Sequence, residues 1–303
     1  MLSTFKKMLM AGLMFFTATA VMAAGALKPF VLGYTTKGDI NAVAEEVKGK
    51  ITDAGFEIVG SYSPYDGALI IAITNDELKK AAASSEFGGY AAGQRVTLTK
   101  VGDEIQVSWT NPLYYGNAYR LSDTSDLEAV TAKLEKALGK KTTFGTGEKE
   151  LTAKDLRKYH YMFGMEYFDD PSELAEYDSY EEAIAAVEKG LAEAAGGVSK
   201  VYRIDIPGKE ETVFGVALTE GCSGDEYIMS RIDKDKLRST GHLPYEILVS
   251  GGDVYALYAR FRIAISWPHL PMIQSDTGAT FFNIMCAPNA IEEALVQAAG
   301  GEI

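Results

Sequence analysis

The feature that most constrains the fold is an order of local signals that occurs twice along the 303 residues. A helical stripe ends at glycine, two apolar strands and a short helix follow, and two alternating strands then flank a Gly-Asp turn. The first set of segments is 40–54, 56–63, 68–74, 76–85, 95–101 and 104–110. The second set is 180–191, 200–206, 212–218, 225–232, 245–250 and 254–262. Because these weak signals share one order, we interpret the chain as one unit that occurs twice.

Each unit is predicted to follow the order β-α-β-β-α-β-β-α. In the first helix, Asp39 is placed to cap the free amides, and apolar residues recur at helical spacing from Ile40 to Ile51. Helices grouped over mostly antiparallel strands define an α+β fold in which one sheet face is covered. Two such units would pack side by side through their free edges or open faces.

The domain boundaries follow from this repeat. We predict a first α+β domain at 28–140, a polar linker at 141–150 that is rich in Gly, Thr and Lys, and a second α+β domain at 151–303. The second domain carries an insertion at 266–286. It is expected to open with a strand at 160–168, followed by a solvated acidic loop at 169–178.

The N-terminal residues have the three-part pattern of a secretory signal peptide. Lys6 and Lys7 precede an apolar stretch, and Val21-Met22-Ala23 offers the small residues that signal peptidase requires. We therefore predict removal of residues 1–23 and a periplasmic or secreted mature protein, with an uncleaved anchor helix as the alternative. No later segment has the roughly 20 apolar residues of a membrane span. A formal net charge of −13 argues against a nucleic-acid partner, because phosphate binding depends on Lys and Arg.

Three motifs of the first unit carry a resemblance to a known family. They are Ala54-Gly55-Phe56-Glu57-Ile58, the segment from Leu69 through Asn75 to Arg95-Val96, and Asn111-Pro112. They resemble the domain-of-unknown-function 302 (DUF302) family of small proteins with a TATA-binding-protein-like fold. The family has Pro after the Asn and Pro ahead of the hairpin, where this chain has Asp76 and Gly93-Gln94.

The resemblance covers 30–138 directly and 162–299 through the internal repeat. It therefore implies a tandem repeat of the DUF302 fold. The family has no settled activity, so the resemblance implies no site residues. The name of the fold does not imply DNA binding either, because function depends on sites rather than on folds.

Cys222 and Cys286 are the two cysteines of the chain. In an oxidising compartment, such a pair favours a disulfide bond. The alternatives are two buried, unreactive thiols, or a reactive thiol at Cys222, which precedes a predicted helix.

The segment 160–168 contains the candidate metal ligands. If it is a strand, His160, Met162 and Glu166 point to one face, with adjacent side chains about 7 Å apart. Imidazole and thioether groups suit Cu(I), so the sequence admits a copper or haem carrier that uses these residues. His242 and His269 are the other histidines. The alternative is a core strand whose methionines and aromatics only pack.

No catalytic motif is present: the sequence lacks a Gly-x-Ser-x-Gly elbow, a phosphate-binding loop, an EF-hand and a Cys-x-x-Cys-His haem site. This favours a binding protein over an enzyme. Our leading hypothesis is a two-domain exported protein that binds a small ligand or a periplasmic partner protein, with a pocket between related domains as the expected site. The alternative is the copper or haem carrier, and a homodimer is compatible with either function.

Overall fold

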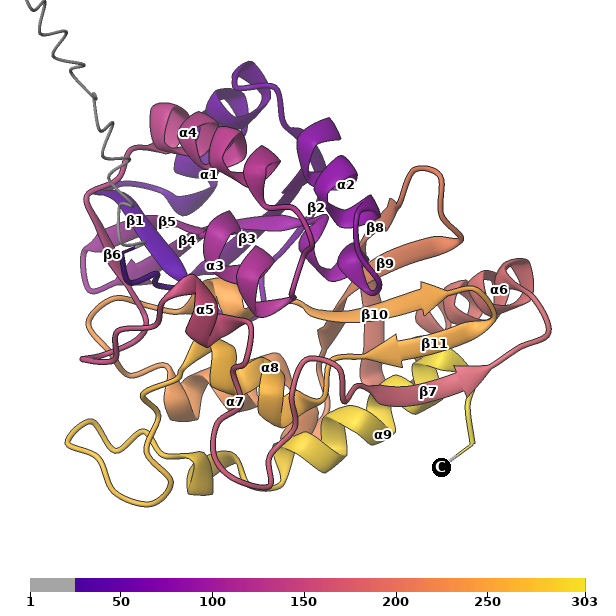
Figure 1. The fold of residues 1–303 in the computed structure, drawn as a ribbon. Coiled ribbons are helices and arrows are strands. Elements are labelled where there is room, and N and C mark those ends of the chain that lie inside the picture. Colours follow the sequence, from indigo (N-terminus) through magenta and orange to yellow (C-terminus); the bar gives the residue numbers. More distant parts are fainter. Residues whose placement is uncertain (1–24, 303) are drawn as a thin grey trace, which may run out of the picture.

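The computed structural model describes residues 25–302 (Figure 1). The predicted signal peptide, residues 1–23, lies outside them. Among the helices of this described part, we find none with the length and apolar character needed to cross a membrane.

The first half is an antiparallel sheet with helices on one face. Its strands lie in the order β2-β3-β4-β5-β1-β6. The elements are β1 (Phe30–Thr36), α1 (Ile40–Asp53), β2 (Glu57–Tyr62), β3 (Ala68–Thr74), α2 (Asp76–Ala83), the 3-10 turn η1 (Gly88–Ala91), β4 (Gln94–Val101), β5 (Glu104–Thr110), α3 (Pro112–Ala118), α4 (Ser125–Leu138) and β6 (Thr142–Phe144).

Helix α1 forms as the sequence predicts. The Asp39 side chain accepts hydrogen bonds from the amides of Asn41 and Ala42, both at 3.0 Å, and so caps the first turn. The apolar stripe from Val43 to Ile51 is buried against β2, β3 and β4. Figure 1 shows α1, α2 and α4 together on the side of this sheet that faces away from the second half.

The second half repeats this arrangement. Its strands lie in the order β7-β11-β10-β9-β8, again antiparallel. The elements are α5 (Ala153–Leu156), β7 (Ser172–Glu176), α6 (Tyr180–Ala192), η2 (Ala195–Gly197), β8 (Val198–Asp205), β9 (Glu211–Leu218), η3 (Gly221–Ser223), α7 (Asp225–Ile232), η4 (Thr240–His242), β10 (Tyr245–Ser250), β11 (Asp253–Ala256), α8 (Ala259–Ser266), η5 (Phe281–Ile284) and α9 (Ala287–Ala299).

Five strands of each sheet lie in the same order. The matched pairs are β1 and β7, β2 and β8, β3 and β9, β4 and β10, and β5 and β11. Irregularities in the pairing also match. Gly33 in β1 and the matching Leu174 in β7 have no partner residue in the neighbouring strand. The same holds for Val59 in β2 and Val201 in β8. The predicted α+β class, with helices on two mostly antiparallel sheets, is confirmed.

The uncovered faces of the two sheets meet. Turn η4 packs on β3, β4 and β5 of the first sheet, and η1 packs on β9 and β10 of the second. Strands β2 and β8 also lie side by side. A Cβ at Gly60 would meet the Val201 carbonyl oxygen at 2.1 Å, so glycine permits this close approach. The polar side of the first sheet is thereby buried, and it consists of Arg95, Thr97, Thr99, Gln106, Ser108 and Thr110.

Three sequence-based predictions of local structure are wrong. Residues 160–168 are not a strand, because the chain turns at Met162–Met165 and Gly164 has φ of 81°. The expected acidic loop at 169–178 instead contains β7. The strand predicted to run to residue 262 ends at Ala256, and α8 follows. Because nearly every α8 side chain is buried, its sequence has no helical polar face to mark it.

The segment predicted as a linker contains β6. This short strand pairs with β1 at Phe30–Leu32, so residues 142–144 extend the first sheet.

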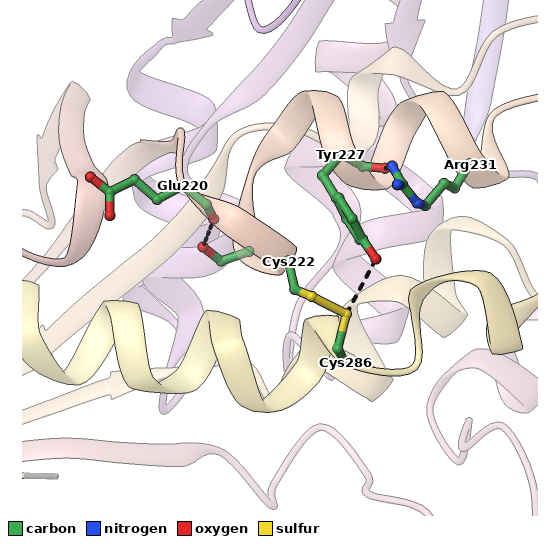
Figure 2. The surroundings of a disulfide bond; sticks show 6 residues. Glu220, Cys222, Tyr227, Arg231 and Cys286 are labelled. Carbon is green, nitrogen blue, oxygen red and sulfur yellow. Dashed lines mark hydrogen bonds between the residues drawn. A yellow bond between two sulfur atoms is a disulfide. The ribbon is translucent and has the colours of Figure 1, made fainter.

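Cys222 and Cys286 form a disulfide bond, as the sequence predicts. Figure 2 shows that it joins η3, which precedes α7, to the start of α9. The Tyr227 hydroxyl lies 3.3 Å from the Cys286 sulfur. The bond therefore ties two helices of the second half to each other, in the part of the fold that carries the 266–286 insertion.

Candidate functional site

The predicted metal ligands lie in a loop between α5 and β7. His160 Nδ1 is 2.8 Å from the Met162 carbonyl oxygen, and the imidazole stacks on the Tyr167 ring at 4.4 Å between centroids. Glu166 forms an ion pair with Arg260, with Nε to Oε2 at 3.0 Å. The strand that was expected to align the three side chains is missing, so the copper or haem site remains a prediction from sequence.

Acidic, histidine and cysteine side chains provide no ready metal cluster elsewhere. Within residues 25–302, no group of three or more of these side chains is placed to hold an ion. His269 binds Asp235 instead, with Nε2 to Oδ2 at 2.9 Å, and His242 is completely buried.

A buried ionic cluster lies where the two sheets meet. Arg95 of β4 forms an ion pair with Glu246 of β10, and the Arg262 Nε of α8 lies 3.5 Å from the second carboxylate oxygen of Glu246. The Tyr202 hydroxyl donates to Glu246 at 3.0 Å. All three charged side chains are 1–2% exposed. Solvent cannot reach this cluster, so it joins the halves rather than forming an open site.

The electrostatics of this cluster follow from burial. Burial by itself would lower the pKa of Arg95, but the Glu246 carboxylate beside it raises the pKa above its ordinary value. Burial also raises the pKa of Tyr202, and it lowers that of His242 well below the ordinary range. Both arginines are therefore charged while Tyr202 and His242 are neutral. Removing one member of such a buried group commonly costs about 3–5 kcal/mol.

An open pocket of about 320 Å³ lies between the halves, beside this interface. We call it the interdomain pocket. The first half supplies Tyr65, Asp66, Thr99 and Lys100, and the second supplies Glu226, Met229, Ser230, Asp233, Lys234 and Arg238. Lys100, Lys234, Asp66 and Glu226 are exposed.

Hydroxyl groups connect the two halves at the base of the interdomain pocket. The Thr240 hydroxyl of η4 lies 2.7 Å from that of Thr99 and 3.0 Å from that of Tyr65. Thr240 is completely buried, whereas Tyr65 lines the opening. The docking of η4 on the first sheet therefore fixes the relative position of the residues that line the pocket.

Asp233 is the unusual group of the interdomain pocket. It follows α7 and is 5% exposed. Its Oδ1 accepts from the Ser239 amide at 2.9 Å, and Oδ2 has no hydrogen-bond partner among the described residues. Burial raises the pKa of Asp233 to about 7. At neutral pH, this carboxyl group is therefore present in both its protonated and its charged form.

Six charged side chains line the interdomain pocket: Asp66, Lys100, Glu226, Asp233, Lys234 and Arg238. None of them forms a salt bridge with another residue in 25–302. The pocket thus offers both signs of charge and several hydroxyl groups. It contains no histidine or cysteine, so the arrangement suits polar recognition.

Sequence reasoning did not identify this pocket. Tyr65 lies in the turn after Pro64, and Asp233 lies directly after a predicted helix; neither position has a motif. The two residues are far apart in the sequence, and both line the pocket because η4 packs on the first sheet. The expectation of a pocket between related domains was the sequence-level signal that pointed here.

Comparisons with known proteins give limited information. No family model matches the sequence, and no curated protein matches it. Among solved structures, the chain is similar to the "uncharacterized conserved protein DUF302 from Bacillus stearothermophilus", with 14% identity and a TM-score of 0.31. The match covers 35% of this chain and 94% of that chain. It concerns the fold of about one third of this protein and supplies no site residue.

Proposed function

We propose that this protein is exported and binds a small charged molecule in the interdomain pocket, without chemical turnover. The observation that carries the proposal is the set of six charged side chains, from both halves, that surround this pocket without salt-bridge partners. Their mixed signs favour a zwitterionic ligand with separate anionic and cationic groups.

The size and chemistry of the interdomain pocket support a small ligand. A volume of about 320 Å³ is at the lower end of the roughly 300–1,000 Å³ typical of ligand pockets. Lys100 and Lys234 come from opposite halves, are exposed, and offer two cationic groups to an anionic part of the ligand. The exposed carboxylates of Asp66 and Glu226 can pair with a cationic group of the same ligand.

Export is supported by the signal-like N-terminus and by the cysteine chemistry. A disulfide bond persists in oxidising compartments such as the periplasm. The Cys222–Cys286 bond is consistent with the predicted periplasmic or secreted location.

We further propose that both halves derive from one domain of the DUF302 type. The identical strand order of the two sheets and the matching irregularities in their pairing support a duplication. The predicted boundaries, with the first domain at 28–140 and the second at 151–303, remain part of this proposal. Strand β6 would then belong to the first domain rather than to a linker.

Native mass spectrometry of protein isolated from cells that produce it naturally tests the binding function. We expect a small-molecule adduct that is retained by the wild type and lost in Lys100→Glu/Lys234→Glu. The control Lys37→Glu/Lys136→Glu makes the same change in net charge at exposed positions outside the pocket and should keep the adduct. An adduct that persists in the pocket variant, or no adduct in any sample, would contradict the proposal. Conversion of the released molecule by pure protein would contradict its non-catalytic part.

A further inference from the structure

The first strands of the two halves differ at their outer edges. In the first half, β6 covers the outer edge of β1, with Phe30 opposite Phe144 and Leu32 opposite Thr142. The Lys141 amide donates to the Leu32 carbonyl oxygen at 2.7 Å. In the second half, β7 pairs with β11 on one side, and no described strand pairs with its other side.

After the last helix of each half, the chain passes close to the first strand of that half. The backbone turns differ: Gly139 follows α4 with φ of 77° and ψ of 174°, and Gly300 follows α9 with φ of 79° and ψ of 17°. A Cβ at Gly139 would lie 3.3 Å from the Gly33 carbonyl oxygen, and one at Gly301 would lie 2.0 Å from that of Leu174. Gly33 and Leu174 are the residues of β1 and β7 that have no partner residue in the neighbouring strand. The position equivalent to β6 therefore lies along β7, beyond Gly301.

A groove of about 640 Å³ lies against β7 and β11 beside that position, and we call it the β7 groove. It is lined by Glu173–Tyr177 of the β7 segment, by Asp253 and Tyr255 of β11, and by Gly300–Glu302. Its charged residues are all acidic: Glu173, Glu176, Asp253 and Glu302. None of these four carboxylates forms a salt bridge with the part of the chain that the structure describes.

We propose that the β7 groove binds an extended, basic segment of a partner protein, which adds to β7 as an antiparallel strand in the place that β6 takes beside β1. An open strand edge offers main-chain donors and acceptors, which is the basis of recognition by strand addition. The acidic lining selects Lys and Arg side chains on the added strand. A second copy docked edge to edge through β7 would bring the two acidic linings together, so charge repulsion disfavours that occupant.

Strand β6, which pairs with β1 inside this chain, provides the sequence of a test peptide. Strand β6 is preceded by Lys140 and Lys141, so residues 139–146 of this chain already combine basic charge with a strand that pairs in this way. A fluorescent peptide with the sequence Gly-Lys-Lys-Thr-Thr-Phe-Gly-Thr is titrated with the whole mature protein at low ionic strength. Anisotropy reports binding, and hydrogen exchange reports protection of the amides of β7.

Two peptide controls separate charge from main-chain pairing. Replacing both lysines by glutamate should abolish binding. Replacing the first Thr, which corresponds to Thr142 opposite Leu32, by Pro removes a main-chain donor that faces the neighbouring strand and should weaken binding strongly, because Pro interrupts a strand ladder. In the protein, Glu173→Lys/Glu176→Lys should weaken binding by roughly tenfold or more. The matched variant Glu45→Lys/Glu46→Lys on α1 should bind as the wild type does.

The expected result is salt-sensitive binding with slowed exchange in Ser172–Glu176. Equal binding of the Glu or Pro peptide, unchanged affinity in Glu173→Lys/Glu176→Lys, or absence of binding would overturn the proposal. Protection of β7 that instead rises with protein concentration, together with dimers in sedimentation, would also overturn it, because the occupant would then be a second copy. The interdomain pocket is not needed for this result, so the two proposals succeed or fail separately.

Discussion

Strands β4 and β10 occupy the same place in the two halves, yet their second residues have opposite charges. Arg95 in β4 and Glu246 in β10 face each other across the interface between the sheets. In a dimer of identical units, this place would bring two like charges together without solvent. In one chain the two matched positions can carry different residues, and here they form an ion pair.

The helices α2 and α7 also differ in the burial of their first residue. In the first half, α2 begins at Asp76, which is exposed. In the second half, α7 begins at Asp225, which is 2% exposed and accepts a hydrogen bond from the Tyr62 hydroxyl at 3.0 Å. The second half therefore contributes buried carboxyl groups to the interface, while the first half contributes Arg95 and tyrosines. Chemistry at the interface depends on these differences more than on the shared fold.

The largest expected effect comes from removing the charge of Glu246. Glu246→Gln leaves Arg95 and Arg262 buried without a carboxylate, so we expect a loss of about 3–5 kcal/mol in the free energy of unfolding. Arg95→Met should cost less, because Glu246 keeps Arg262 as its partner. Denaturation in urea measures both variants. Equal stability of Glu246→Gln and the wild type would contradict the role assigned to this cluster.

The disulfide bond is expected to have the second largest effect. Cys222 and Cys286 are 64 residues apart, and closing a loop of that length stabilises a protein by about 2–4 kcal/mol. Cys222→Ala/Cys286→Ala should lose that amount, as measured by urea denaturation. Hydrogen exchange should show the loss mainly in α7, α9 and β9, while α1 and β3 of the first half keep their protection. A uniform loss across both halves would show that they unfold as one unit.

Much of the fold could be predicted because the signals are local. Asp39 and the stripe after it identified α1, and the alternation in 95–101 and 104–110 identified β4 and β5. The same alternation could not show that Thr97 and Ser108 are buried, because that depends on the other half of the chain. For the same reason, the interdomain pocket could not be derived from sequence. Helix α8 was missed because burial on nearly all sides removes the periodicity that marks a helix.

Protonation of the buried carboxyl groups in the second half should give the third largest effect. Burial raises the pKa values of Asp225 and Asp233 from an ordinary 3.8 to about 7. Between pH 3.8 and pH 7, these two carboxyl groups are protonated in the folded state and charged in the unfolded state. The contribution of the two groups to stability is therefore largest near pH 4 and is lost as pH rises toward 7. The advantage of the wild type over Asp233→Asn should fall by about 2–3 kcal/mol between pH 5 and pH 7.

His242 contributes to the pH dependence of stability with the opposite sign. This contribution cancels in the difference in unfolding free energy between the wild type and Asp233→Asn. Burial lowers the pKa of His242, so its effect on stability is lost as pH falls below its ordinary value, in wild type and variant alike. Asp53→Asn, on the surface of α1, is the control and should follow the wild type at every pH. A constant difference between the wild type and Asp233→Asn would show that this carboxyl group is already charged at pH 5.

The smallest expected effect concerns the loop before β7, which has no counterpart in the first half. A Cu(I) ion at His160 and Met162 would have two ligands, because Glu166 is held by Arg260, and His160 would also have to give up its contact with the Met162 carbonyl oxygen. We therefore expect weak binding, so that micromolar free Cu(I) stabilises the protein by less than about 1 kcal/mol. Competition with a chromogenic Cu(I) chelator should show weak binding that His160→Ala removes and Glu166→Gln preserves. Tight binding that depends on Glu166 would instead mean that the loop rearranges around the metal. The second half would then contain the metal site that the sequence predicts, in a conformation that differs from the present one.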